Sequence, residues 1–184
     1  DMIIITGASR GVGNFLINSF IKDIKEPVIG IYNNSKPSDK SEFFTKIDVR
    51  NLDEINSFVK YRKEDLKEIT LINCAGIFGP SFEEQQIENI DLKKFQESIM
   101  INSLAIIKII QLILKNKPTI MLINVSSDAG SISNNNQGNA YIYRTSKTAL
   151  NSITKNMSID LYNRFKTVVF AVDPGNVQSG MNPE

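Results

Sequence analysis

A tyrosine and a lysine placed four residues apart form the pair in this sequence best suited to proton transfer. Tyr143 and Lys147 lie in a stretch with helical spacing, so their side chains share one face of a helix. A free phenol has a pKa of about 10, and a nearby ammonium group favours its ionised form. A phenol tuned in this way gives a proton to a forming alkoxide and takes it back in the reverse direction.

Two alternatives stand beside this interpretation. A tyrosine and a lysine at this spacing in an arbitrary helix are more often a solvated pair, so the pair needs support from other motifs. Tyr141 is a rival for the proton-transferring role, but the residue four positions after it is Thr145, which carries no charge. Tyr141 is therefore expected to pack or to contact substrate.

A glycine-rich turn near the N-terminus has the context of a phosphate-binding loop. It follows an apolar run at residues 2–6 and opens a helical pattern at residues 11–24. Glycine permits the tight turn and the close approach of backbone to a pyrophosphate, and a helix N-terminus offers free N–H groups to the phosphates. An ordinary glycine-rich turn is the alternative, but the position between first strand and first helix favours nucleotide binding. The expected contacts are Gly7, Ser9, Arg10, Gly11, Val12 and Gly13.

The elements that must position these residues alternate along the chain. Strands are predicted at residues 2–6, 28–32, 43–47, 69–73, 119–125 and 167–172, and helices at residues 11–24, 52–62, 92–114 and 141–162. Near-continuous apolar strands separated by helices indicate a parallel sheet that is buried on both faces. No repeat or linker divides the 184 residues, so a single doubly wound α/β domain is expected.

The composition narrows the possible chemistry and partners. The sequence has no histidine, which excludes a Ser-His-Asp triad and imidazole ligands, and no metal site is expected. A net charge of +1, with acids and bases interspersed, gives no reason to expect nucleic acid or membrane as a partner. The longest apolar run, residues 99–114, is interrupted by Asn102, Lys108 and Gln111, so no membrane span is expected. Cys74 is the single cysteine, and no signal peptide is visible, so a reduced, cytoplasmic protein is expected.

Further motifs follow in order at the ends of the predicted elements: Asp48-Val49, Asn73-Cys74-Ala75-Gly76, Asn102, Ser126-Ser127, Tyr143-Arg144-Thr145-Ser146-Lys147 and Pro174-Gly175-Asn176-Val177-Gln178-Ser179. With the Gly-x-x-x-Gly-x-Gly spacing of the first turn, this series resembles the short-chain dehydrogenase/reductase family over essentially the whole chain. The stretch Tyr-x-Tyr-Arg-x-Ser-Lys-x-Ala-Leu-Asn is similar to the branch of C-factor and Sniffer-type carbonyl reductases. The polar loop at residues 131–138 is expected to border the substrate entrance.

The resemblance implies one NAD(P)-binding Rossmann domain over residues 1–184, with six or seven strands and helices on both faces. It assigns a catalytic group in which Tyr143 is the general acid/base and Lys147 contacts the nicotinamide ribose. Ser127 would stabilise the substrate oxygen, because the family pattern Ser-x-x-Gly ends at Gly130. Asn102 would hold a water that links Lys147 to solvent; the alternative is a polar residue that kinks the helix and is satisfied by backbone.

The resemblance also implies the remaining cofactor contacts. Asp48 and Val49 would hold the adenine, although Asp48 could equally be a turn or helix-capping residue, and Cys74 is expected to be a small buried residue rather than a nucleophile. The full set adds Asn33, Asp48, Val49, Asn73, Ala75, Gly76, Tyr143, Lys147, Pro174, Gly175, Val177 and Ser179 to the glycine turn.

The preference between the two nicotinamide cofactors depends on the end of the second strand. An acid there would bind the ribose hydroxyls of NAD, but this chain has Tyr32-Asn33-Asn34-Ser35-Lys36. Arg10 and Lys36 could both reach a 2′-phosphate, unless both are solvated surface charges. NADP(H) is therefore favoured, with NAD(H) as the alternative.

The predicted activity is hydride transfer between the nicotinamide and a small carbonyl or alcohol substrate. A homodimer or homotetramer is expected, with apolar surface from Ile99, Ile106, Ile110 and Ile113 unless core packing explains them. The C-terminal lid and last strand of the family are not found in the sequence, which leaves the substrate open. One alternative is a cofactor-binding regulatory or signalling protein with little turnover; the intact Asn, Ser, Tyr and Lys set argues against it. The chain is too short for the substrate domain of an isomerase or sugar-nucleotide enzyme.

Overall fold

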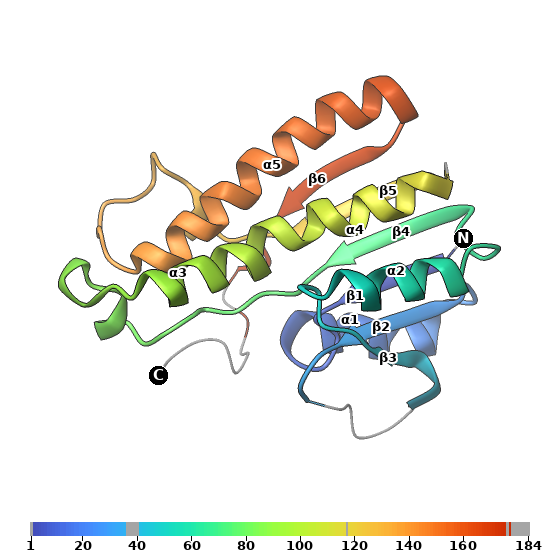
Figure 1. Ribbon diagram of the computed structural model, residues 1–184, viewed down its shortest axis with the longest axis horizontal. Helices are drawn as coiled ribbons and strands as arrows, with labels where there is room; N and C mark the ends of the chain where they lie inside the picture. Colours follow the sequence, from blue (N-terminus) through green and yellow to red (C-terminus); the bar gives the residue numbers. More distant parts are fainter. Residues whose placement is uncertain (1, 36–40, 117, 176, 178–184) are drawn as a thin grey trace.

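The computed structural model describes residues 2–35, 41–116, 118–175 and 177, and its centre is one parallel sheet of six strands (Figure 1). The strands are β1 (Met2–Thr6), β2 (Val28–Tyr32), β3 (Phe44–Lys46), β4 (Glu68–Asn73), β5 (Thr119–Val125) and β6 (Val168–Val172). The main helices are α1 (Gly11–Asp23), α2 (Leu52–Tyr61), α3 (Leu92–Ile99), α4 (Ala105–Ile113) and α5 (Tyr141–Phe165). The predicted doubly wound, Rossmann-type fold is confirmed.

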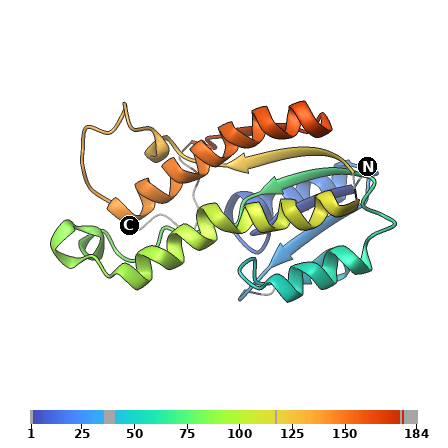
Figure 2. The same cartoon turned by 45° about the horizontal axis from the view of Figure 1, so that its top comes forward.

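Helices cover the two faces of the sheet unequally. Successive side chains of a strand point to opposite faces, so Met2 and Ile4 of β1 join a core with α2, α4 and α5. Ile3 and Ile5 of the same strand pack instead with Ile17 of α1. Figures 1 and 2 show α1 behind the sheet and the other long helices in front of it.

The order of the strands fixes the place of the site. The order is β3-β2-β1-β4-β5-β6, so the chain moves outward from β1 in one direction and from β4 in the other. Because β1 and β4 are parallel neighbours, with Thr6 opposite Asn73 at their carboxyl ends, a crevice opens at that edge of the sheet. The loops after β1, β4 and β5 therefore meet there.

The segment predicted as one helix at residues 92–114 is divided in three. A π-helical turn, Met100–Leu104, lies between α3 and α4 and contains the buried residues Asn102 and Ser103. The continuous helical segment Leu92–Asn116 is long and apolar enough to cross a membrane by length and composition, contrary to the prediction. Core packing accounts for the apolar residues of α4, because Ile106, Ile110 and Ile113 lie in the core beside the sheet, whereas Leu92 and Met100 are exposed.

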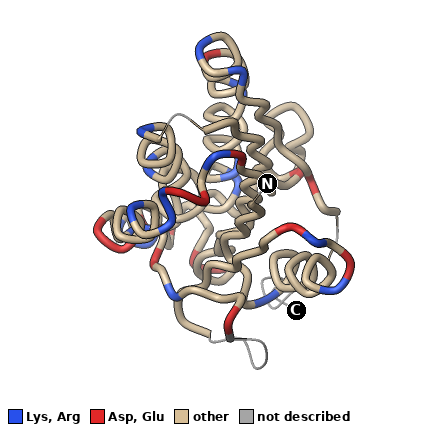
Figure 3. The backbone as a smooth tube through the Cα atoms, turned by 90° about the vertical axis from the view of Figure 1, so that its right-hand side faces the viewer, with Lys and Arg blue, Asp and Glu red and all other residues tan. Residues whose placement is uncertain are grey.

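The surface carries mixed charge and one apolar strip. Basic and acidic residues alternate around the outside of the molecule (Figure 3). On the α1 side of the sheet, register places Met121 beside Val168 and Val125 beside Val172. The exposed side chains of Met121, Val168, Phe170 and Val172 form an apolar strip there. The described helices leave this strip open, although apolar surface of this kind is normally covered by another element or another molecule.

Candidate active site

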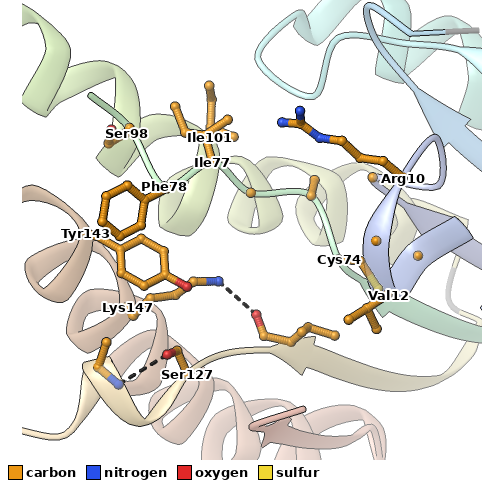
Figure 4. A pocket seen from close by; sticks show the side chains of 18 of the residues that line it. Arg10, Val12, Cys74, Ile77, Phe78, Ser98, Ile101, Ser127, Tyr143 and Lys147 are labelled. Atoms are coloured by element: carbon orange, nitrogen blue, oxygen red, sulfur yellow. Dashed lines mark hydrogen bonds between the residues drawn. The ribbon is translucent and has the colours of Figure 1, made fainter. Parts of the chain in front are cut away.

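A cleft of about 1190 Å³ lies at the carboxyl edge of the sheet, where the strand order predicts it. Its walls include all of the predicted site residues that the structure describes, except Asn73 and Asn102. Ser179 and Lys36, which were also predicted near the cofactor, lie outside the described residues. The cleft brings together residues from nearly every loop at this edge, and Figure 4 shows its central part.

The glycine turn forms one end of the cleft with its backbone packed very closely. Gly7 has a φ of +65°, and a Cβ there would lie 2.7 Å from the backbone nitrogen of Ala75. A Cβ at Gly13 would lie 2.5 Å from the carbonyl oxygen of Gly7. Side chains are therefore excluded at both positions, and the backbones of the loops after β1 and β4 touch at Gly7.

The N-terminus of α1 opens into this end without a cap of its own. Its N-cap residue, Arg10, makes no capping hydrogen bond with its side chain, and the first turn contains no acidic residue. Uncapped N–H groups and the positive end of the helix dipole suit a phosphate group. The Arg10 side chain extends over the cleft (Figure 4), and no hydrogen bond or ion pair engages it among the described residues. The turn thus fits the pyrophosphate of a dinucleotide.

Asp48 lies farther along the same wall and is held by an arginine that the sequence interpretation did not include. Arg50 donates from its Nη2 atom to Asp48 at 2.6 Å and from its Nη1 atom to Glu97 of α3 at 2.6 Å. The Arg50 guanidinium lowers the pKa of Asp48, and a contact with Asn33 lowers it further. Asp48 is therefore a charged acceptor that faces the cleft, and Arg50 ties this wall to α3.

The predicted catalytic side chains meet at the other end of the cleft. The Nζ atom of Lys147 lies 5.8 Å from the centre of the Tyr143 ring and donates a hydrogen bond to the Val125 carbonyl at 3.0 Å. The Ser127 hydroxyl lies on the same side (Figure 4), accepts from the Ala129 N–H at 3.2 Å and donates to Asp128 at 3.1 Å. The phenol, the hydroxyl and the ammonium group therefore face one volume.

The pKa values in this group differ from the prediction. Burial raises the pKa of the Tyr143 phenol, the carboxylates of Asp128 and Asp173 raise it further, and the Ser127 hydroxyl offsets part of the rise. Burial also lowers the pKa of Lys147 to about 8. The net change in the tyrosine pKa is therefore opposite to the predicted lowering, because desolvation of the buried phenol is the largest effect. The phenol is held in its neutral, proton-donating form.

Asn102 acts through hydrogen bonds to protein groups. Its side-chain amide donates to the Ile77 carbonyl at 2.8 Å and accepts from the Ile77 N–H at 2.8 Å. It also donates to the Ser146 hydroxyl at 2.8 Å, and that hydroxyl donates to the Tyr143 carbonyl at 2.7 Å. These contacts match the alternative interpretation, a kink residue satisfied largely by backbone, and they link the π-helical turn to the catalytic helix.

Asn73 was predicted to line the cleft, but its side chain lies within the protein. It accepts a hydrogen bond from the Thr6 hydroxyl at 2.8 Å and donates to Asn124 at 2.9 Å, and Asn124 donates to Thr154 at 3.0 Å. The Thr6 hydroxyl in turn accepts from the Ala75 N–H at 3.1 Å. Asn73 therefore shapes the cleft by holding the ends of neighbouring strands together.

Two other predictions concern neighbouring residues. Tyr141 neither packs in the core nor lines the cleft: its side chain is exposed at the start of α5. Burial raises the pKa of the Cys74 thiol to about 12, which makes it a poor nucleophile, as expected. Tyr143 is thus the tyrosine that reaches the cleft.

Several residues with clear roles in the site carry no motif. Asp173 accepts from the Asp128 N–H at 3.1 Å and from the Gly175 N–H at 3.0 Å, so it joins the loops after β5 and β6. The Phe78 ring packs against Tyr143 with ring centres 5.0 Å apart. Gln85 donates and accepts hydrogen bonds around the same tyrosine. Arg50 had a usable signal, its place next to Asp48-Val49, whereas Gln85 had none.

Fold and cleft together define a Rossmann-type α/β protein with a tyrosine, a serine and a lysine grouped at one end of its crevice. The chain matches the short chain dehydrogenase family over residues 1–184, and it belongs to that family. The resemblance seen in the sequence is therefore confirmed.

Curated relatives share part of their length with this chain. A short-chain type dehydrogenase/reductase of Sinorhizobium fredii, y4vI, is 27% identical over 191 residues, which cover 100% of this chain and 34% of the relative. The probable short-chain type dehydrogenase/reductase VdlC of Helicobacter pylori is 32% identical over 122 residues, or 64% of this chain and 41% of the relative. The C-signal of Myxococcus xanthus is 33% identical over 115 residues, or 60% of this chain and 66% of that protein. The chain thus spans only about a third of the first relative and two fifths of the second.

Solved structures of similar fold cover nearly all of the chain. The carbonyl reductase Sniffer of D. melanogaster matches with a TM-score of 0.84 and 26% identity, over 98% of this chain and 82% of that one. The NADPH-bound carbonyl reductase from chicken fatty liver matches with a TM-score of 0.82 and 24% identity, over 100% of this chain and 78% of that one. The similarity to the chicken protein shows a shared fold.

Proposed function

We propose that this chain carries the cofactor-binding and catalytic part of an NADP(H)-preferring oxidoreductase that interconverts a small carbonyl compound and its alcohol. One observation carries the proposal: the Tyr143 phenol, the Ser127 hydroxyl and the Lys147 ammonium face one end of a cleft whose other end is an uncapped, glycine-lined helix N-terminus. A dinucleotide carries its pyrophosphate between the adenosine and the nicotinamide riboside, so a phosphate site beside the glycine turn and a tyrosine, a serine and a lysine farther along the cleft suit its charge and the position of its reactive ring.

The described residues supply a contact for each part of the cofactor. The turn from Gly7 to Gly13 and the N-terminus of α1 would hold the pyrophosphate, and Arg10 would meet a 2′-phosphate. Asp48 would accept hydrogen bonds from the adenine, and the loop at Pro174 and Gly175 would border the nicotinamide. When bound, the nicotinamide supplies or accepts the hydride.

The catalytic side chains handle the proton and the developing charge. Because burial keeps the phenol neutral, Tyr143 donates its proton to the alkoxide oxygen that forms as the carbonyl is reduced. The Ser127 hydroxyl donates a hydrogen bond to the same oxygen, which replaces its hydrogen bond to Asp128. Lys147 remains largely protonated below its pKa of about 8, and its positive charge stabilises the phenolate left on Tyr143.

Proteins of the same fold support a nicotinamide cofactor without deciding which one. The chicken carbonyl reductase was solved with NADPH, a dehydrogenase of Burkholderia multivorans with NADP, and one of Brucella ovis with NAD. The preference for NADP(H) rests on the Arg10 side chain and on Asn33, which stands where an acid would bind the ribose hydroxyls of NAD.

Tyr143→Phe tests the proton-transfer role, and Tyr141→Phe is a matched control two residues away on the same helix. Turnover is followed by the absorbance of reduced nicotinamide against a panel of aldehydes, ketones, quinones and keto esters. We expect Tyr143→Phe to abolish turnover while NADPH still binds, and Tyr141→Phe to behave as wild type because Tyr141 is exposed. Equal turnover in the two variants would refute the assignment of Tyr143.

Arg10→Ala tests the cofactor preference, with Lys22→Ala as a control cation on the exposed part of the same helix. A charge-assisted contact to a phosphate contributes about 1.5–3 kcal/mol, so we expect NADPH to bind roughly 10- to 100-fold more weakly to Arg10→Ala. NADH binding should change little in either variant. Equal losses for both cofactors would contradict the role of Arg10.

A second candidate function is a cofactor-binding regulatory or signalling protein with little turnover. The similarity to the protein named C-signal favours it, over 60% of this chain. The same variants separate the two functions: NADPH binding without turnover on any substrate of the panel would favour the second.

A further inference from the structure

We propose that Gln85 is a positioning residue that fixes Tyr143 in the cleft by capping the catalytic helix from a distant loop. The hydrogen bonds of Gln85 do not depend on the activity of the chain, but their importance for catalysis rests on the function proposed above. Gln85 ends the short 3-10 helix Glu83–Gln85, which lies in the loop after β4, 58 residues before Tyr143 in the sequence.

The start of α5 lacks the usual means of satisfying its backbone. Its N-cap residue is Ala140, which has no side-chain acceptor and adopts a left-handed conformation with a φ of 53°. Arg144 donates to the Ala140 carbonyl at 2.9 Å, so the N–H groups before it precede the hydrogen-bonded ladder of the helix. Tyr143 carries one of these donors, and the catalytic residue would begin its helix with an unsatisfied group.

Gln85 supplies the missing acceptor. Its Oε1 atom accepts from the Tyr143 N–H at 2.9 Å, and its Nε2 atom donates to the carbonyls of Pro80 at 2.8 Å and Phe78 at 3.3 Å. The side chain is completely buried, with 0% exposure. An amide turned the other way would place an NH₂ group against the Tyr143 N–H, so this orientation alone satisfies the three partners.

The same contacts set the position of the phenol. The Phe78 carbonyl is held by Gln85, and the Phe78 ring lies 5.0 Å from the Tyr143 ring (Figure 4). The Tyr143 carbonyl, in the next peptide group, accepts a hydrogen bond from the Ser146 hydroxyl. The N–H and the C=O of Tyr143 are thus both held by side chains, and its ring is packed against the loop that Gln85 closes. Losing the Gln85 contact would free the Tyr143 N–H and loosen the loop against which its ring packs.

Two substitutions and one control test the proposal in the full chain. Gln85→Met keeps the length of the side chain and removes its hydrogen bonds. Gln85→Glu places a carboxyl group there, which imitates the amide when it is protonated and repels the Pro80 and Phe78 carbonyls when it is ionised. Gln86→Met changes the exposed neighbour and should behave as wild type. Circular dichroism with and without urea checks that each variant is folded.

The first readout does not need turnover. NMR measures the hydrogen exchange of the Tyr143 amide and the titration of its phenol, using tyrosine labelled at the ring carbon that bears the hydroxyl. We expect Gln85→Met to speed the exchange of this amide by at least about 10-fold, because the start of the helix opens more readily once the Tyr143 N–H has lost its acceptor. We also expect a shift in the phenol pKa. Gln85→Glu should resemble wild type at acid pH. At alkaline pH its carboxylate can still accept from the Tyr143 N–H but is repelled by the Pro80 and Phe78 carbonyls, so the phenol pKa should shift as in Gln85→Met while the amide exchange stays slower than in that variant.

The second readout is catalysis. A phenol displaced by a fraction of an ångström should lower kcat by roughly 10- to 100-fold and move the pH profile of kcat, with the Kd for NADPH unchanged. The proposal would be overturned if Gln85→Met showed the same amide exchange, phenol titration and kcat as wild type. It would also be overturned if Gln86→Met changed these quantities as much as Gln85→Met does. If wild type itself shows no turnover, the proposed function fails, while amide exchange and phenol titration still decide the role of Gln85. If Gln85→Met does not fold, the pH series of Gln85→Glu decides it.

Discussion

Burial of the Lys147 ammonium should reduce the stability of the folded chain at neutral pH. Its side chain is 5% exposed, and its Nζ atom donates to the Val125 carbonyl at 3.0 Å. Burial lowers the pKa of this group from 10.5 to about 8. A neutral carbonyl does not offset the loss of solvation of a full charge, so the folded chain favours the uncharged amine more than the unfolded chain does.

The size and sign of the effect follow from these two pKa values. Each unit of pKa corresponds to about 1.4 kcal/mol, so the change from 10.5 to about 8 corresponds to about 3 kcal/mol. Below pH 8 the lysine is charged in both states, and the full cost lowers the free energy of unfolding. Between pH 8 and 10.5 the unfolded chain binds more protons, so this lysine makes the free energy of unfolding rise with pH. Above 10.5 both states are neutral, and the cost is gone.

Urea unfolding across this pH range measures the effect in wild type, Lys147→Met and Lys155→Met. Other lysines and tyrosines titrate in the same range, but they are common to the proteins and cancel in the difference between wild type and Lys147→Met. That difference should move by about 3 kcal/mol in favour of wild type between pH 8 and 10.5. Lys155 is exposed on the same helix, so its substitution should give a curve parallel to that of wild type.

Parallel curves for wild type and Lys147→Met would refute the reasoning, because they would mean that the ammonium is well solvated at the floor of the cleft. A difference that moves in favour of the variant would mean that a partner stabilises the charged form in the folded chain. The expected result also implies a conflict between stability and function, since Lys147→Met should lose the charge that stabilises the phenolate of Tyr143.

Two further substitutions test the packing around the site. Gly130→Ala would place a Cβ 2.9 Å from the backbone carbonyl of Lys147, so we expect a loss of about 1–3 kcal/mol in urea unfolding and lower turnover as α5 moves. Asn73→Ala would leave the buried Thr6 hydroxyl without its acceptor and the Asn124 side-chain oxygen without its donor, so we expect a loss of about 2–4 kcal/mol. A change below about 0.5 kcal/mol for either variant would contradict the packing described for it.

Much of the fold was predictable because its signals are local. A buried parallel strand reads as an unbroken apolar run, as in β1 and β2, and each run ends where its loop begins. Carboxyl ends of parallel strands share one edge of the sheet, so residues that follow them, such as Asp48, Ser127 and Pro174, were expected in one cleft. That expectation required no knowledge of side-chain contacts.

The contacts that were missed depend on orientation and burial. Asn73 ends a strand like other predicted site residues, but it stands in register with Thr6 and Asn124, and the three side chains bond to one another within the sheet. The direction of the Tyr143 pKa change depends on how deeply the ring is buried, which no spacing reveals. The bond between Gln85 and Tyr143 joins positions 58 residues apart, and an isolated glutamine in a loop gives no signal.

The two ends of the cleft are therefore built by different means, and they should respond differently to substitution. The phosphate-binding turn at the cofactor end is backbone packed on backbone, where Gly7 and Gly13 exclude side chains. The end that holds Tyr143 depends on buried amides and hydroxyls, above all Gln85, Asn102 and Ser146, each of which has a hydrogen bond to another segment. Substitutions at the first end should weaken cofactor binding before they affect the phenol. Substitutions at the second end should displace the phenol while the cofactor still binds, so cofactor affinity and kcat should vary independently across variants of this chain.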